Sequence, residues 1–357
     1  RSGEYQLPWT YLHATKDYVD MAAHLEAHPS AKAVVNFAPV LLDQLLDYSS
    51  QIQNYLSNGS PIQDRLLQAL AEPVLPGAEE QKHELIRDCL KVNETRVIER
   101  FEPFHKLANM AKTILDDDDI LKYLDDQYLF DLLTWYHLGW IAETVRREDL
   151  VIQQLMKKGS DFTVHDRREL LQIISRLMSS IIPRYKKLAE QCQIELCMSP
   201  YAHPIIPLLL EVGSAQEAMP DVSLPMLKAY PGGKERSAWH IHKGIEHFEH
   251  TFGMKPSGCW PSEGSLSMAT LDTLSDAGFA WAASGGSVLH NSFAETENNT
   301  PDCIHHAYTF ADNKLACFFR DDGLSDLIGF NYTEWHADDA VANLVHHLEN
   351  IADSCAD

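Results

Sequence analysis

Polar residues that could take part in bond cleavage gather in three short stretches of the chain. The first stretch ends at His203, the second surrounds Glu263, and the third begins at Arg320. Glu263 is the only charged residue between Gly258 and Ser265, where small and turn-forming residues surround it. A carboxylate in such surroundings must be paired, lie exposed in a site, or have a shifted pKa. We expect the chain to leave a strand here and to present Glu263 to a cavity.

Each of the three stretches follows a segment that is predicted to be a strand. Ligands in parallel α/β folds bind at the carboxyl ends of the strands, so the three stretches should meet there. Glu263 and Asp321 would then be two carboxylates at one mouth, surrounded by aromatic, His and Arg side chains. Two such carboxylates can cleave a glycosidic bond, one as nucleophile or base and the other as acid. The same residue types also serve in metal sites and in structural ion pairs, and spacing alone leaves these alternatives open.

The elements that must position these residues follow an α/β pattern in the first and last parts of the chain. Short apolar strands, typical of a buried parallel sheet, are predicted at residues 33–37, 193–197, 279–283 and 315–319. Helical periodicity predicts helices at residues 15–27, 237–252, 266–277 and 338–352. Residues 285–301 are predicted to be a polar loop. From about residue 60 to 190 strand signals nearly vanish, and we interpret this block as a long helical insertion in the α/β scaffold.

Two of the predicted helices carry side chains that could bind a ligand. Residues 131–140 are rich in aromatic side chains, which pack in a core more often than they stack on sugars. Residues 237–252 contain His242, Glu246 and His250 at a spacing of four, which can bind a metal. Polar residues on the outward face of a helix need no ligand, so we predict no metal site there.

The composition argues against several classes of protein. The 357 residues include 52 acidic and 29 basic ones, and the formal charge of −23 disfavours nucleic acid or an anionic membrane as a partner. The seven cysteines are an odd number without a Cys-X-X-Cys pair, which argues against a disulfide framework or a zinc site. The first residues are no signal peptide and no apolar run has transmembrane length, so we expect a cytoplasmic protein. The missing initiator Met leaves a lost leader as an alternative.

The three stretches resemble the signature regions of glycoside hydrolase family 57, which contains α-amylases, 4-α-glucanotransferases and amylopullulanases. The run from Trp260 to Ser265 is similar to the third region of that family, and residues 318–330 resemble the fourth. Residues 193–195 together with 201–204 resemble the second region. Residues 11–18, 35–39 and 135–140 also look like family sequence, so the resemblance covers essentially the whole chain.

The resemblance implies a fold, a mechanism and roles for individual residues. The fold is an incomplete (β/α)7 barrel of the pseudo-TIM type, and the mechanism is a retaining one that needs no metal or cofactor. By match, Glu263 is the nucleophile and Asp321 the general acid/base, with the adjacent Asp322 as the alternative. The implied substrate-binding residues are His203, Trp260, Arg320, Tyr201 and Asp326, of which Asp326 supports the site or caps a turn. The implied substrates are α-glucans such as starch, glycogen and maltooligosaccharides.

The chain departs from the family pattern at both of its ends. The His-Gln-Pro signature of the first strand, the last signature and the C-terminal helical bundle have no counterpart here. We therefore expect residues 1–357 to be a catalytic barrel that is truncated at both ends, with its helical insertion at about 60–190. Because an open barrel exposes strand edges, we predict the isolated chain to be inactive or poorly soluble.

Two functions from other classes compete with this interpretation. A metal-dependent polysaccharide deacetylase on a related barrel would need an Asp and two His at the mouth. His203 could serve, but no second His follows a strand end in a suitable place. A non-catalytic glucan-binding protein is the other alternative, and the coexistence of Glu263 and Asp321 argues against it. Motifs do not distinguish hydrolysis from transglycosylation, or α-1,4 from α-1,6 bonds, and they say nothing about the oligomeric state.

Overall fold

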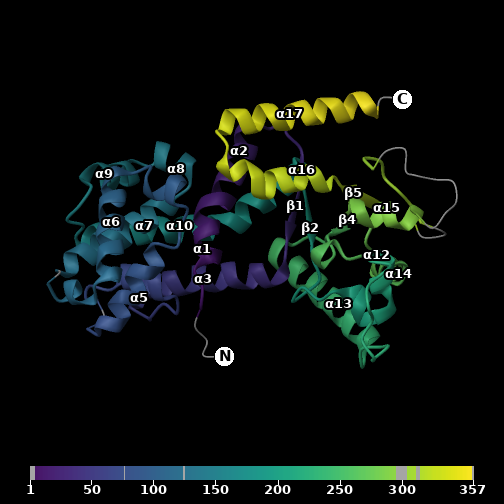
Figure 1. Cartoon of the computed structure of the whole chain (residues 1–357), viewed down its shortest axis with the longest axis horizontal. Coiled ribbons are helices and arrows are strands. Elements are labelled where there is room, and N and C mark those ends of the chain that lie inside the picture. The colour runs from purple at the N-terminus through teal and green to yellow at the C-terminus, as the bar shows by residue number, and fades with distance from the viewer. Residues whose placement is uncertain (1–4, 76, 124, 295–303, 311–313, 356–357) are drawn as a thin grey trace. The chain divides into compact units, whose positions relative to one another are not determined.

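The computed structural model describes residues 5–75, 77–123, 125–294, 304–310 and 314–355. The chain forms two compact units, which are coloured along the sequence in Figure 1. Residues 1–32 and 41–194 make up a helical unit, and residues 33–40 and 195–357 make up an α/β unit. No helix in the described part of the chain is both long enough and apolar enough to cross a membrane.

The helical unit has α7 (Asp126–Trp140) at its core. Twelve of the fifteen residues of α7 are buried, including Trp135 and Tyr136. Asp125 begins the helix by accepting a hydrogen bond from the Gln127 N–H. The aromatic residues of this segment therefore pack in a core, as predicted, and do not form an exposed sugar-stacking platform. The other helices of the unit are α1 (Trp9–His13), α2 (Val19–Ala27), α3 (Pro39–Asn58), α4 (Arg65–Ala71), α5 (Glu79–Cys89), α6 (Glu102–Asp116), α8 (Glu143–Glu148), α9 (Leu150–Lys158) and α10 (Val164–Glu190).

The buried His137 of α7 is held by two hydrogen bonds. Its Nδ1 lies 2.7 Å from the carbonyl oxygen of Leu133, which can only accept, so Nδ1 carries the proton. Its Nε2 then accepts from the Tyr11 hydroxyl at 3.0 Å. Burial lowers the pKa of His137 to about 4, against the smaller opposing effect of the Leu133 carbonyl. The ring is therefore neutral at physiological pH, and it ties α7 to the first helix of the chain.

The α/β unit is built on a sheet whose strands follow one another in chain order. The strands are β1 (Ala33–Phe37), β2 (Ile194–Met198), β3 (Gly258–Cys259), β4 (Trp281–Gly285) and β5 (Ala316–Arg320). The pairs from β2 to β5 are all parallel, as predicted. The expected burial of the strands is wrong for β1 and β5, in which exposed side chains such as Val34 and Phe318 alternate with more buried ones. The helices of this unit are α11 (Ile206–Leu210), α12 (Ala215–Ala218), α13 (Gly233–Phe252), α14 (Met268–Asp276), α15 (Gly286–Ala294), α16 (Asp322–Asp326) and α17 (Ala337–Ser354).

The short strand β3 needs a glycine at its first position. A Cβ atom on Gly258 would lie only 1.9 Å from the Trp281 ring of the neighbouring strand. Glycine therefore allows β3 and β4 to pair closely, with Gly258 opposite Trp281 and Cys259 opposite Ala282. Close pairing at this point places the loop after β3 next to the end of β4.

One prediction about this unit was wrong. Residues 285–301 are not a loop throughout, because α15 occupies Gly286–Ala294, while residues 295–301 lie outside the described part of the chain. Leu289 on α15 is fully buried, and the Asp322 carboxylate accepts a hydrogen bond from the Ser287 N–H in the first turn of this helix. Both interactions depend on residues that are distant in sequence, so local polarity did not reveal the helix.

Candidate active site

Glu263 lies on a tight turn that leaves β3. The turn spans Ser262–Gly264, and Glu263 itself has a left-handed backbone with φ 57° and ψ 20°. Residues with a Cβ rarely adopt this conformation, because it brings the Cβ close to the backbone. The Ser284 hydroxyl of β4 donates to the Gly264 carbonyl at 2.5 Å and so fixes the turn to the sheet. As a result the Glu263 side chain points outward and is 75% exposed.

His203 belongs to the loop after β2, and it contacts Glu263. Its Nε2 lies 3.0 Å from Oε1 of the glutamate, although the two residues are 60 positions apart. Ala202 and His203 both have left-handed backbones, with φ values of 58° and 57°. The first two polar stretches therefore meet, as the strand-end rule predicted.

The third stretch meets the second through Arg320 and Trp260. The guanidinium carbon of Arg320, at the end of β5, lies 5.8 Å from the centre of the Trp260 ring, within the range of a cation–π contact. The backbone N–H of Trp260 donates to the Met198 carbonyl of β2, and this bond holds Trp260 at the strand ends. Arg320 Nε also donates to Asp322 Oδ1 at 2.8 Å.

Asp321 and Asp322 face different neighbours, although they are adjacent. Asp321 precedes α16 and accepts a hydrogen bond from the Leu324 N–H at 2.9 Å. Its Oδ2 lies 3.8 Å from His305 Nε2. Asp322 instead accepts from the Ser287 N–H of α15 at 3.0 Å and from Arg320. Burial acts to raise the pKa of Asp322, but the Ser287 N–H and the Arg320 guanidinium outweigh it and hold that pKa below its usual range.

Glu263 and Asp321 follow strands that lie on either side of β4. Cys259 of β3 and Cys317 of β5 both pair with Ala282 of β4. Each carboxylate residue follows its cysteine by four positions. One strand, β4, therefore separates the strands that carry the two carboxylates, and two strand spacings correspond to roughly 10 Å.

The chain matches the sequence pattern of glycosyl hydrolase family 57 over residues 1–357. The chain belongs to this family. Membership of glycosyl hydrolase family 57 confirms the resemblance and the predicted fold class, in which the parallel sheet of the α/β unit is part of an incomplete (β/α)7 barrel. No curated protein matches the chain.

Three solved structures are similar to the chain, and two of them are described as family 57 branching enzymes. An α-amylase from Thermotoga maritima shares 12% identity over 92% of this chain and 43% of its own, with a TM-score of 0.45. A branching enzyme from Pyrococcus horikoshii shares 15% identity over 91% and 44%, with a TM-score of 0.41. A branching enzyme from Thermococcus kodakaraensis shares 14% identity over 93% and 46%, with a TM-score of 0.40. The chain spans less than half the length of each of these proteins.

Two further residues singled out by the family 57 resemblance lie in different surroundings. Tyr201 packs edge-on against Trp239 of α13, with 5.8 Å between the ring centres, and its N–H donates to the His240 carbonyl. Asp326 is exposed at the end of α16, and its side chain does not cap the turn that follows. Of the two roles expected for Asp326, the capping of this turn is therefore wrong, while support of the site by Asp326 and sugar binding by either residue stay predictions.

Two residues that were not predicted from the sequence contact the adjacent aspartates of this family 57 chain. His305 faces Asp321, and Ser287 binds Asp322 through its N–H. Neither residue belongs to a motif, and Ser287 lies in a segment that is predicted to be a loop. The pairing of β4 with β5 brings Ser287 to Asp322, and the antiparallel bridge between Tyr308 and Cys317 brings the segment of His305 to β5. No local signal could have found either contact.

The described residues also bear on the metal-dependent alternative. No group of three or more His, Cys, Asp or Glu side chains within the described ranges is placed to hold a metal ion. On α13, Glu246 pairs with Lys243 at 3.1 Å on the outer face of the helix. The Asp and two His of a deacetylase therefore have no counterpart in this part of the family 57 chain.

Cys355 is disulfide-bonded, which the scattered cysteines did not indicate.

Proposed function

We propose that this chain carries the nucleophile and the acid/base of a retaining enzyme that cleaves or transfers α-glucans. The observation that supports it most is the placement of Glu263. This carboxylate projects from a left-handed turn, lies 3.0 Å from His203 Nε2, and follows a strand that only β4 separates from the strand before Asp321. A left-handed residue with a side chain costs about 1–3 kcal/mol, and such strain clusters at active sites. The strained turn aims Glu263 at the space beyond the strand ends.

In the first step of the reaction, ionised Glu263 attacks the anomeric carbon of the bound sugar. At the same time Asp321 gives its proton to the glycosidic oxygen, so that the leaving sugar departs as a neutral alcohol. The Nε2 of His203 then serves as a hydrogen-bond donor that orients the Glu263 carboxylate. In the second step Asp321, now ionised, takes a proton from the acceptor that displaces Glu263 from the sugar. Water as acceptor gives hydrolysis, and a sugar hydroxyl gives transglycosylation.

Asp321 is a better general acid than its neighbour Asp322. The Asp322 carboxylate is bound by the Arg320 guanidinium and by the Ser287 N–H, and both stabilise its ionised form. A low pKa makes Asp322 a poor proton donor at neutral pH. Asp321 instead lines a cavity, where its Oδ2 lies near His305. We assign Asp322 the task of holding α15 and Arg320 in place.

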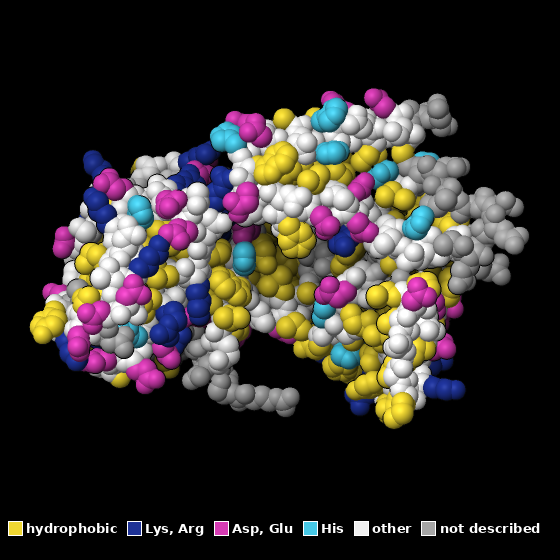
Figure 2. All heavy atoms as spheres, viewed as in Figure 1, with side chains coloured by type: hydrophobic (Ala, Val, Ile, Leu, Met, Phe, Trp, Pro, Cys, Tyr) yellow, Lys and Arg dark blue, Asp and Glu magenta, His cyan; other side chains and the backbone are white. Residues whose placement is uncertain are grey.

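A neutral sugar fits the surroundings of these residues. The Trp260 ring offers an apolar face for stacking, and Arg320 and His203 offer hydrogen-bond donors for hydroxyl groups. The formal charge of −23 disfavours an anionic ligand. Figure 2 shows that Asp and Glu side chains are dispersed over the visible face and do not gather in one patch, which fits a general role in solubility.

Incubation of the full-length protein with maltoheptaose tests this proposal. Shorter maltooligosaccharides alone indicate a hydrolase, whereas products both shorter and longer than the substrate indicate a transferase. Retention is checked by nuclear magnetic resonance, since the first product must be the α-anomer. The absence of any new sugar with maltoheptaose, starch and glycogen, under conditions where the protein is folded, would contradict the proposal.

A further inference from the structure

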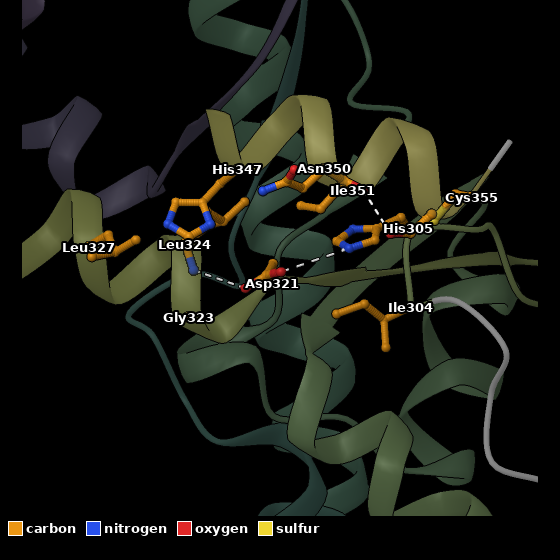
Figure 3. A pocket seen from close by; sticks show the side chains of 11 residues that line it. Ile304, His305, Asp321, Gly323, Leu324, Leu327, His347, Asn350, Ile351 and Cys355 are labelled. Atoms are coloured by element: carbon orange, nitrogen blue, oxygen red, sulfur yellow. Dashed lines mark hydrogen bonds and ion pairs between the residues drawn. The ribbon is translucent and has the colours of Figure 1, made fainter. Parts of the chain in front are cut away.

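A cavity of about 640 Å³ opens beside Asp321 in the α/β unit. Its walls are the start of α16, residues 304–305 and one side of α17 (Figure 3). Figure 3 shows His305, His347 and Asn350 arranged around Asp321, with the apolar side chains of Leu324 and Ile351 between them. The cavity thus combines one carboxylate with the polar side chains of His305, His347, Asn350 and Ser354 and with an apolar lining.

This combination suits a sugar ring better than it suits an ion. The volume lies within the range of about 300–1,000 Å³ that small-molecule pockets occupy, and such pockets are mostly apolar with a few placed polar groups. A glucosyl unit has apolar C–H faces and a rim of hydroxyls. Leu324 and Ile351 can cover a face, while Asn350 and His347 can exchange hydrogen bonds with the rim.

The position of Asp321 decides which sugar unit the cavity would hold. A general acid must lie next to the glycosidic oxygen, and the leaving sugar extends from that oxygen away from the nucleophile. Asp321 lines the cavity, whereas Glu263, Arg320 and Trp260 do not. The bond to be cleaved then lies between Glu263 and the cavity.

We propose that this cavity binds the sugar unit on the leaving-group side of the scissile bond, and that Asn350 and His347 of α17 are its hydrogen-bonding residues. The same unit is the acceptor in transglycosylation. This inference rests on the proposed function, because it takes Asp321 as the acid/base. It assigns α17, a helix without any buried residue, a role in acceptor choice.

Asn350→Ala and His347→Ala test the assignment, with Glu349→Ala as the matched control. Glu349 is exposed on the same helix and does not line the cavity. With maltosyl fluoride as donor and maltose as acceptor, each cavity variant should raise the acceptor KM about tenfold, the effect of one lost hydrogen bond. The control should keep the wild-type value. An equal loss in acceptor transfer and in fluoride hydrolysis would indicate a merely structural defect and overturn the inference.

Calorimetric titration with maltose gives a second readout that needs no turnover. Weaker maltose binding by Asn350→Ala and His347→Ala than by Glu349→Ala supports the cavity as a sugar site, and equal affinities overturn it. The two proposals fail in different ways. If the wild-type protein turns over maltosyl fluoride and has the same acceptor KM for maltose as the cavity variants, only the cavity inference is lost. If maltose binding depends on Asn350 but the wild-type protein never cleaves a glucan, the proposed function is lost and the binding site stands.

Discussion

His203 Nε2 lies 3.0 Å from Glu263 Oε1, and both residues have a left-handed backbone with φ 57°. Two loops that follow neighbouring strands thus meet through two strained residues. Each strained residue costs free energy that packing elsewhere must offset. The contact fixes the direction in which the Glu263 carboxylate points, which is what an attacking group requires.

Glu263→Gln should lower kcat on maltooligosaccharides by at least about 10³-fold, because an amide cannot attack the anomeric carbon. The fold should persist, since the side chain is largely exposed and packs against little. Glu249→Gln is the matched control, because Glu249 is an exposed residue of α13. Rates are measured by reducing-sugar release, and folding by circular dichroism. Wild-type turnover in Glu263→Gln would refute the assignment of the nucleophile.

His203→Ala should lower kcat about tenfold, because the Glu263 carboxylate loses a donor that holds its direction. The effect is modest since both partners are partly exposed to water, which screens their interaction. Gln at position 203 can still donate from its amide and should restore part of the loss. His250→Ala on the outer face of α13 is the control. A loss of thermal stability without a change in kcat would show that the contact is structural.

Asp321→Asn and Asp322→Asn should behave differently. Asp321→Asn removes the proton donor, so cleavage of maltoheptaose should fall by about 10²–10⁴-fold. The variant should form the glycosyl-enzyme from maltosyl fluoride with a much smaller loss, because fluoride leaves without a proton. Asp322→Asn should mainly cost about 1 kcal/mol of stability or less, since it weakens a half-exposed pair with Arg320. Steady-state rates and thermal unfolding check this prediction. If Asp322→Asn lost activity and Asp321→Asn lost only stability, Asp322 would be the acid/base.

The pH dependence of stability should report His137 in the helical unit. Its pKa is lowered to about 4 in the folded protein, whereas an unfolded His titrates near 6.5. Between these values the unfolded chain binds the extra proton, so acidification favours unfolding. The contribution of neutral His137 to the free energy of unfolding is therefore fully present above about pH 6.5. It falls by up to about 3 kcal/mol as the pH approaches 4.

Denaturant unfolding at pH 7 and pH 5 checks this dependence. His137→Gln should be less stable at pH 7, because it disturbs the bonds to Tyr11 and Leu133, but it should lose less stability on acidification. His165→Gln, at an exposed site of α10, should keep the wild-type dependence. An unchanged pH dependence in His137→Gln would contradict the sign and the site of the effect.

Local patterns in the sequence were sufficient for the type of fold and for the candidate residues. The apolar runs at 33–37, 193–197, 279–283 and 315–319 match strands β1, β2, β4 and β5 within one or two residues. Such runs indicate a preference for strands, which is a local property of the chain. They overstated the burial, since exposed side chains alternate with more buried ones in β1 and β5. Because ligands bind where parallel strands end, the same patterns also indicated that His203 and Glu263 would meet, and the structure confirms it.

Tertiary structure alone decided how the two adjacent aspartates divide their contacts and where α15 lies. Asp322 turns to Ser287 and Arg320, whereas Asp321 turns to His305 and the cavity beneath α17. The contact of Asp322 with Ser287 depends on the register of β4 with β5, whereas His305 belongs to a segment that the antiparallel bridge of Tyr308 with Cys317 joins to β5. Residues as far apart as Ser287 and Asp322 carry no common local signal. The sequence by itself thus determined the family and the residues that are candidates for its chemistry. The order and register of the strands decided which of them meet, because pairing distant segments depends on the whole sheet and not on any one stretch.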